Sequence, residues 1–378
     1  MTNDTPDGTR TMARALEAID APASAIWLRP EALLTGSAAR RAIEQGVALS
    51  LAGGNSAFTH VEVMGRQGDD IVSALAPVRR VQYWASQLDA TRRARIEAQL
   101  SRISETRFHW AGLPLDRPLV MGIVNATPDS FYRGSGGDPN TAIALGRAMH
   151  EAGADIIDIG AESTRPGAAP VSEAEELQRL EPVVRALAAS DAVISVDTRH
   201  VKVMAAALAW GARIINDVSA LEGAGSIEIV AKTGAPVVIM HMRGEPGTMQ
   251  QDPHYVLASL DVADYLAQRI AACEAAGIPR HRIVVDPGIG FGKTLAHNLE
   301  IMARLGLLHA LGCGVLIGVS RKSSIGRLSG GAPAEQRLPG SIAGALQALR
   351  QGAQILRVHD VAETKQAVAI WQAIADGA

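Results

Sequence analysis

The chain has 378 residues, enough for one large and one small domain, and 47% of them are apolar although only 3% are aromatic. A core of this composition rests on Ala, Val, Ile and Leu, the mixture typical of parallel sheets covered by helices. The formal net charge of −3 excludes a global positive field that would attract nucleic acid. Two cysteines, Cys273 and Cys313, exclude a disulfide scaffold and a multi-cysteine zinc site, and they suit a reducing compartment.

The first 25 residues contain no uninterrupted apolar segment of the kind found in signal peptides, and we expect a loose, disordered tail there. Apolar stretches elsewhere are strand-sized, well short of the roughly 20 residues that span a bilayer. The sequence therefore predicts a cytoplasmic protein that does not enter a membrane.

Residues 26–112 predict a small α+β module after this tail. Its expected strands, separated by Gly- and Asp-containing turns, are ALSLAGG (48–54), AFTHVEVMG (57–65) and DDIVSALA (69–76). A charged amphipathic helix is expected over 88–105, and its arginines are more typical of a solvated face than of a site for an anionic partner. The two prolines of AGLPLDRP (111–118) mark the boundary. We favour a role in stability or dimer formation over a separate activity.

Residues 118–378 repeat one pattern, in which short β-branched runs alternate with Ala-rich helical segments. The eight expected strands are LVMGIVN, DIIDIG, VISVDT, RIINDVS, PVVIMHM, IVVDPGIG, GVLIGVS and ILRVHDV. Apolar residues at helical spacing follow the first two strands, and Ser172 with Glu175 forms a capping box. Eight strand–helix units over about 250 residues predict a (β/α)8 barrel of the TIM type, and a doubly wound open sheet is the alternative.

Polar residues follow the strands of the predicted barrel at the points where the strands end. They are Asn125, the segment AESTRPGA (161–168), Asp197, Asn216 with Asp217, His241, Asp286, SRK (320–322), and Arg357 with His359. A single Asp or Asn at such a point often caps the next helix, but caps do not require Lys, Arg and His. Because barrel chemistry lies at the carboxyl ends of the strands, we expect one shared polar pocket there.

The expected pocket has two chemical halves. Asp197, Asn216 and Asp286 can bind a flat heterocycle that presents N–H donors and ring acceptors. The basic residues Lys322, Arg357 and His359 lie where many barrels bind phosphate. The sequence thus favours a heterocyclic, phosphorylated substrate. A zinc site on His241 and His359 is the alternative, but it lacks an evident third ligand.

The segment DPGIGFGKT (286–294) resembles a phosphate-binding P-loop only superficially. The G-x-x-x-x-G-K pattern requires glycine at position 287, which is Pro287, and the G-x-G-x-x-G pattern is equally incomplete. We therefore expect a glycine-rich strand–helix loop that allows a ligand to approach closely.

These segments together resemble the dihydropteroate synthase family, in order and across residues 118–372. The residues that carry the resemblance are GIVNATPDSF, DIIDIGAESTRPGA, ISVDT, IINDVS, MHMRGEPGTMQ, VVDPGIGFGKT, GVSRKS and GSIAGALQALRQGAQILRVHDV. The resemblance implies a transferase that joins 4-aminobenzoate to (7,8-dihydropterin-6-yl)methyl diphosphate and releases diphosphate with the help of Mg2+. It also implies a homodimer, with small-molecule substrates and no nucleic acid or membrane partner.

The resemblance also implies roles for individual residues. For the pterin they are Asp197, Asn216, Met240, Asp286, Phe291 and Lys322. For the diphosphate they are Asn125, which also binds Mg2+, Thr164, Arg357 and His359. For 4-aminobenzoate they are Thr164, Arg165, Pro166 and Ser320. Asp197, Lys322, Arg357 and His359 would be catalytic, and the loops 125–137 and 161–170 would close to exclude water.

Two positions depart from the family pattern in these loops. The first loop reads SFYRGS, with Arg133 where the family commonly has an acidic residue, and the second begins with Ala161 in place of glycine. Arg133 keeps open the alternative of a catalytically weak pterin-binding paralogue. A pterin-binding methyltransferase is the alternative enzyme, although it has little use for SRK and RVHD at a diphosphate site.

Overall fold

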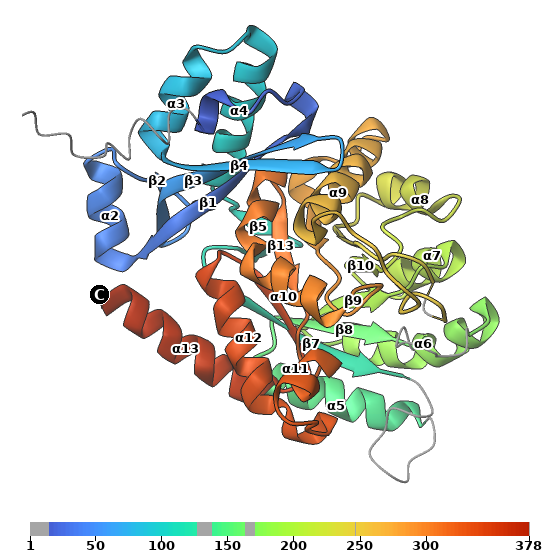
Figure 1. The fold of residues 1–378 in the computed structure, drawn as a ribbon. Coiled ribbons are helices and arrows are strands. Elements are labelled where there is room, and N and C mark those ends of the chain that lie inside the picture. The colour runs from blue at the N-terminus through green and yellow to red at the C-terminus, as the bar shows by residue number, and fades with distance from the viewer. Residues whose placement is uncertain (1–14, 127–137, 163–170, 246, 378) are drawn as a thin grey trace, which may run out of the picture. The chain divides into compact units, whose positions relative to one another are not determined.

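The computed structural model describes residues 15–126, 138–162, 171–245 and 247–377. The chain forms two compact units, and Figure 1 traces both along the chain. One unit comprises Met1–Thr106, Arg304–Gly312 and Ala373–Ala378, and the other comprises Arg107–Ala303 and Cys313–Gln372. We call them the N-terminal unit and the barrel unit. In the part of the chain that is described, no helix has the length and apolar character needed to cross a membrane.

The barrel unit is a closed (β/α)8 barrel, which confirms the predicted fold class and excludes the open sheet. Its eight parallel strands are β7 (Leu119–Asn125), β8 (Ile156–Gly160), β9 (Val193–Asp197), β10 (Ile214–Asp217), β11 (Val237–Met240), β12 (Ile283–Asp286), β13 (Gly314–Ile317) and β14 (Ile355–Val358). Strand β14 pairs with β7 and closes the barrel. Crossover helices connect the strands, because parallel strands need a long connection between them.

Helices follow the strands and lie around the outside of the barrel (Figure 1). They are α5 (Pro139–Glu151), α6 (Glu173–Ala188), α7 (Val201–Ala209), α8 (Ser226–Thr233), α9 (Ala258–Ala275), α10 (Leu295–Ala303), α11 (Ser323–Leu328), α12 (Leu338–Arg350) and α13 (Val361–Gly377). Ser172 accepts a hydrogen bond from the Glu175 amide at the start of α6, as its capping-box position predicts.

The amino-terminal half of the barrel interior is apolar. It is filled by one side chain or two from every strand and by Trp110, all of them buried. Trp110 belongs to a short hairpin of β5 (His109–Trp110) and β6 (Leu113–Pro114), and its indole N–H donates to the Arg282 carbonyl at 3.0 Å. The hairpin thereby covers this end of the barrel, and the polar site is confined to the carboxyl end.

The N-terminal unit is an antiparallel sheet with helices, in agreement with the predicted α+β class. Its elements are η1 (Ala23–Ala25), β1 (Ile26–Thr35), α2 (Gly36–Glu44), β2 (Leu49–Ser50), β3 (Ser56–Gln67), β4 (Asp70–Pro77), α3 (Val78–Ser86), α4 (Ala90–Ser104) and η3 (Leu305–Leu311). Strand β1 was not among the predicted strands, since Pro30 and alternating charges interrupt its pattern. It pairs with β3 over nine residue pairs.

Two features of this unit lay beyond the sequence prediction. Residues 15–25 were expected within a loose tail, but Leu16, Ile19 and Ala21 are buried. The segment Arg304–Gly312, which lies between two barrel elements in the sequence, belongs to this unit. Arg304 donates to Glu62 Oε2 at 3.0 Å, and Arg29 donates to the same oxygen at 2.8 Å. The Arg304–Glu62 pair joins segments that are 242 residues apart in the sequence.

Candidate active site

The polar residues of the site continue the interior face of the barrel. Successive side chains of a strand point to opposite faces, so a residue two positions after an interior residue points inward as well. The interior apolar residues Ile156, Ile214, Val284 and Ile355 are each followed at this distance by a polar residue. These polar residues are Asp158, Asn216, Asp286 and Arg357. They form a polar layer above the apolar one.

Arg357 joins three strands in this layer. Its Nε donates to Asp158 Oδ2 at 2.6 Å, and its Nη2 donates to Asp197 Oδ2 at 2.8 Å. Asn216 Nδ2 donates to the same Asp158 oxygen at 3.1 Å. Burial lowers the pKa of Arg357, but Asp158 and Asp197 raise it more, so the guanidinium stays charged. The sequence analysis missed Asp158. The sequence feature that could have identified it is the position of this Asp in the strand DIIDIG, two residues after the interior residue Ile156.

The carboxylates of the site have raised pKa values because they are buried. Burial raises the pKa of Asp197 to about 7, and Asp158 adds to the rise while Arg357 opposes it. Burial also raises the pKa of Asp286, although the Gly288 amide, Lys322 and Arg357 lower it. The Gly288 N–H donates to Asp286 Oδ1 at 2.7 Å. Both groups thus lie in a low-dielectric site where an N–H donor of a ligand is a strong partner.

Lys322 and Phe291 form a neighbouring wall of the site. The Lys322 ammonium lies 4.4 Å from the centroid of the Phe291 ring, a cation–π contact. Met240 is buried and aligns with Asp286 on the adjacent strand. The predicted carboxylate half and basic half are therefore not separate, since Arg357 contacts Asp197 and Lys322 acts electrostatically on Asp286.

Ser320 and His359 lie together at the ends of β13 and β14. The His359 amide donates to Ser320 Oγ at 3.1 Å, and His359 Nδ1 lies 3.0 Å from the same oxygen. Between Ser320 and Lys322, Arg321 has a left-handed backbone with φ +57° and forms an ion pair with Asp360. The flanking residues Ser320 and Lys322 were both predicted to bind substrate.

The glycine-rich loop 286–294 follows a path that requires its glycines. A Cβ on Gly288 would lie 1.9 Å from the His241 carbonyl oxygen, and one on Gly292 would lie 2.3 Å from the Arg243 carbonyl oxygen. Both residues also have positive φ angles. The loop is thus packed against the segment after β11. Lys293 in this loop is buried.

His241 does not resemble a metal ligand in this environment. Its Nδ1 lies 2.8 Å from Lys293 Nζ, and burial followed by the charge of Lys293 lowers its pKa to about 3. Among the described residues, no group of three His, Cys, Asp or Glu side chains could bind a metal ion. The alternative of a zinc site on His241 and His359 therefore has no support in this part of the chain.

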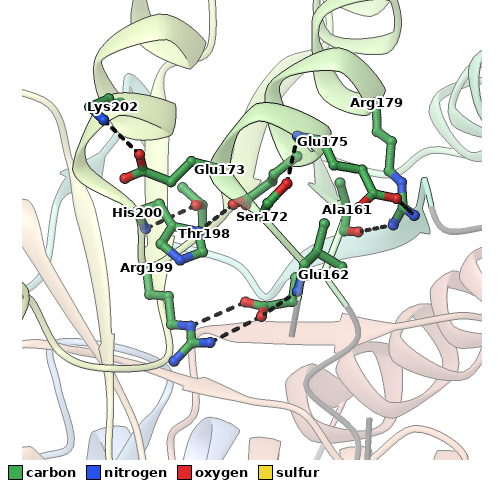
Figure 2. Close-up of polar contacts among 12 residues, drawn as sticks. Ala161, Glu162, Ser172, Glu173, Glu175, Arg179, Thr198, Arg199, His200 and Lys202 are labelled. Carbon is green, nitrogen blue, oxygen red and sulfur yellow. Dashed lines mark hydrogen bonds and ion pairs between the residues drawn. The ribbon is translucent and has the colours of Figure 1, made fainter. Parts of the chain in front are cut away.

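Charged residues anchor both ends of the segment 163–170, as Figure 2 shows for the contacts around Glu162. Arg199 donates to Glu162 through Nε at 3.1 Å and through Nη2 at 3.0 Å. Glu162 also accepts from the Val171 amide at 3.3 Å, and Arg179 donates to the Ala161 carbonyl at 3.0 Å. Thr164, Arg165 and Pro166, like Arg133 in the other loop, lie outside the described residues.

A second acid–base pair joins α6 to the segment after β9. His200 Nδ1 lies 2.6 Å from Glu176 Oε2. Glu176 is fully buried at the start of α6, and burial raises the pKa of its carboxyl group.

Comparison with known proteins agrees with this geometry. Residues 121–359 match the family described as pterin binding enzyme. The chain is 49% identical over 265 residues to the dihydropteroate synthase of Escherichia coli K12. The aligned region covers 69% of this chain and 93% of that protein. Residues before 121 lie outside the family match.

Two solved structures are similar as well. Xanthomonas albilineans dihydropteroate synthase with 4-aminobenzoic acid has a TM-score of 0.66 and 50% identity, covering 70% of this chain and 96% of that one. The same enzyme in complex with 7,8-dihydropteroate has a TM-score of 0.62 and 45% identity, with the same coverage. These relatives are matched over nearly their whole length, and they are dihydropteroate synthases, whereas the sequence had left a pterin-binding methyltransferase open as an alternative. The chain belongs to the dihydropteroate synthase family.

Proposed function

We propose that the chain, as a dihydropteroate synthase of folate biosynthesis, performs its reaction at the carboxyl end of the barrel described above. It condenses (7,8-dihydropterin-6-yl)methyl diphosphate with 4-aminobenzoate, and the products are 7,8-dihydropteroate and diphosphate. The observation that carries this assignment of the site is the contact of Arg357 with both Asp158 and Asp197. This contact places a guanidinium, which can bind diphosphate, next to two carboxylates, which can stabilise a cation.

The pterin is bound through its edge and its faces. Asp197 and Asp286 accept hydrogen bonds from N–H groups at the ring edge, the Asn216 amide can both accept and donate there, and Lys322 donates to a ring acceptor. Met240 and Phe291 contact the faces of the ring. The burial of Asp286 and Asn216 supports this assignment, because buried carboxylates and amides need such partners.

The reaction begins at the bond between the pterin methylene carbon and the diphosphate oxygen. When this bond breaks, its electron pair leaves with the diphosphate and a pterin-methyl cation remains. Asp197 and Asp158 stabilise the cation, while Asn125, Thr164, Arg357 and His359 bind the departing diphosphate. The amine nitrogen of 4-aminobenzoate then attacks the methylene carbon and loses a proton. No protein nucleophile is required.

We assign the second substrate to residues that follow β8 and β13 in the sequence. Thr164, Arg165 and Pro166 contribute from the loop, and Ser320 contributes from the strand end. The anchoring of Glu162 by Arg199 supports this assignment, because Glu162 lies two residues before Thr164 in the sequence.

The donor set at the end of β7 fits Mg2+. Asn125 offers an amide oxygen, and Mg2+ is usually bound by one or two protein oxygens together with substrate phosphates, without an all-protein cage. When bound, Mg2+ would neutralise charge on the departing diphosphate.

We further infer a homodimer in the cytoplasm. The cytoplasmic location is supported by Cys273 and Cys313, which are both unpaired and buried. The homodimer rests on the family relationship. The module 26–112 is proposed to serve stability or dimer formation, and the barrel 118–378 to carry the reaction.

The experiment that tests this function uses the purified chain with both substrates and Mg2+. We expect dihydropteroate and diphosphate to form in equal amounts, as measured by chromatography and a diphosphate assay. The Lys322→Ala variant should lose most of this turnover. Full activity of Lys322→Ala would contradict the site assignment, and pterin binding without turnover would instead indicate the weak paralogue suggested by Arg133.

A further inference from the structure

Lys293 is a buried lysine that the proposed reaction does not use. It follows Gly292 in the loop 286–294, and only 2% of its surface is exposed. Its Nζ lies 2.8 Å from His241 Nδ1, 3.1 Å from the His241 carbonyl oxygen and 3.0 Å from the Phe291 carbonyl oxygen. An ammonium group has three N–H donors, and three acceptors are present here. The surroundings therefore satisfy the charged form of Lys293.

His241 acts as an acceptor in this arrangement. Its pKa is lowered to about 3 by burial and by Lys293, so the ring is neutral and its Nδ1 can accept a hydrogen bond from the ammonium. The rings of Tyr255 and Tyr265 pack against His241 with centroids 5.9 Å and 5.0 Å away. The imidazole is thus fixed from two sides, and it presents a rigid acceptor to Lys293.

The charge of Lys293 reaches the pterin site through Asp286. Burial lowers the pKa of Lys293 to about 7, Asp286 raises it and Lys322 lowers it. In the other direction, Lys293 lowers the pKa of Asp286. The further charged or titratable groups that face this region are Arg243, which acts on His241, and His297, which Lys293 affects. An apolar residue could fill the same volume, but it could not favour the Asp286 carboxylate.

Lys293 also fixes the wall on which Lys322 rests. It donates to the Phe291 carbonyl, and the Phe291 ring lies 4.4 Å from the Lys322 ammonium. The same loop receives hydrogen bonds from Gln250 at the Gly290 carbonyl and from Tyr255 at the Gly292 carbonyl. Lys293 differs from these two anchors because it adds a positive charge as well as hydrogen bonds.

We propose that Lys293 is a positioning residue of the pterin site, whose buried ammonium holds Phe291 against Lys322 and keeps Asp286 ionised to receive the N–H donors of the pterin ring. This inference rests on the proposed pterin site and deepens it. Lys293 does not contact substrate, so it acts through Asp286 and Phe291.

The test compares Lys293→Met, which removes the charge and the donors, with Lys293→Arg, which keeps the charge, and Tyr255→Phe, which removes one loop hydrogen bond without a change in charge. The measurement is the dissociation constant of 6-hydroxymethylpterin by calorimetry between pH 5.5 and 8.5, together with steady-state kinetics for both substrates. For Lys293→Met we expect binding up to about tenfold weaker at the acidic end of this range, because loss of the ammonium raises the pKa of Asp286. The acidic limb of binding should move to higher pH, and KM for 4-aminobenzoate should stay near its wild-type value.

The controls separate charge from loop anchoring. Lys293→Arg should keep the acidic limb where the wild type has it, and Tyr255→Phe should weaken binding without moving that limb. The proposal is overturned if Lys293→Met and Tyr255→Phe give the same pH profile, or if Lys293→Met affects both substrates equally. If Lys293→Met does not fold, the same measurement is made with Lys293→Gln, and the acidic limb of pterin binding should again move to higher pH. An acidic limb that stays at the wild-type pH in Lys293→Gln overturns the proposal. A wild-type protein that does not bind the pterin would contradict the proposed site instead.

Discussion

Arg357 Nε lies 2.6 Å from Asp158 Oδ2, and this contact joins β14 to β8 across the intervening strand β7. Asp158 is fully buried and also accepts from Asn216. One aspartate therefore orients a cationic residue proposed for the diphosphate and an amide proposed for the pterin. The residues proposed for the two subsites are thus linked through one carboxylate oxygen.

Replacing Asp158 with Asn should lower both stability and turnover. Arg357 loses one of its two carboxylate partners, and we expect the free energy of unfolding to fall by about 1–3 kcal/mol. Urea unfolding measures this change, and kcat should fall as Arg357 and Asn216 lose their common acceptor. The matched control is Glu181→Gln, which removes an exposed ion pair with Arg185 at 2.9 Å and should cost about 0.5 kcal/mol or less. Equal effects of the two variants would contradict the role of Asp158.

Asp197 should give activity and stability opposite dependences on pH. Burial raises its pKa to about 7 in the folded chain from 3.8, so the carboxylate needed to stabilise the cation is lost as pH falls through about 7. Ionisation is disfavoured in the folded state, so the contribution of Asp197 to stability is present below pH 3.8 and is lost as pH rises toward 7. We expect kcat/KM to rise through pH 7 while this contribution falls.

The Asp197→Asn variant isolates the two effects. It should lose most of its turnover. Its thermal midpoint should also rise relative to that of the wild type as the pH is raised from 4 to 7, because only the wild type loses the contribution of Asp197. Thermal melts across that range measure the difference. A constant difference would show that Asp197 does not titrate in this window.

Arg199→Met should weaken the use of 4-aminobenzoate more than the use of the pterin. Arg199 makes two hydrogen bonds with Glu162, which lies two residues before Thr164. We expect KM for 4-aminobenzoate to rise by about tenfold, the equivalent of one or two lost charge-assisted hydrogen bonds. Steady-state kinetics with each substrate varied in turn measures this.

The matched control for Arg199 is Lys202→Met. Lys202 also forms an ion pair with a glutamate, Glu173, at 2.9 Å, but its side chain is 77% exposed. Its loss should leave both KM values unchanged. A rise in the KM for the pterin diphosphate equal to that for 4-aminobenzoate in Arg199→Met would argue against a role confined to the second substrate.

Gly288→Ala should destabilise the barrel by more than its backbone conformation alone explains. A Cβ at this position would lie 1.9 Å from the His241 carbonyl oxygen, and φ is +68°. Gly330 has φ +67° with nothing within 4 Å of such a Cβ, so Gly330→Ala measures the conformational cost alone, about 1–2 kcal/mol. Urea unfolding should give a clearly lower midpoint and free energy of unfolding for Gly288→Ala than for Gly330→Ala. Equal midpoints would mean that the loop relaxes to accept the methyl group.

The alternation of strands and helices was sufficient to predict the barrel from the sequence. Periodicity placed the strands, and the chain order together with the right-handed crossovers left few other ways to connect eight of them. The same regularity predicted that Asp197, Asp286 and Arg357 would lie at one end. Strand β1 escaped this reasoning, since Pro30 and charged neighbours obscure its pattern and its pairing with β3 is a tertiary choice.

The sequence by itself thus determined the architecture and the end of the barrel at which polar residues gather, because both depend on local periodicity and chain order. Only the tertiary structure decided that Asp158 is the common partner of Arg357 and Asn216, that Lys293 is buried against His241, and that Arg304–Gly312 belongs to the N-terminal unit. These facts depend on the distances between strand ends and loops after the barrel closes. Such distances arise from packing, and no spacing along the chain encodes them.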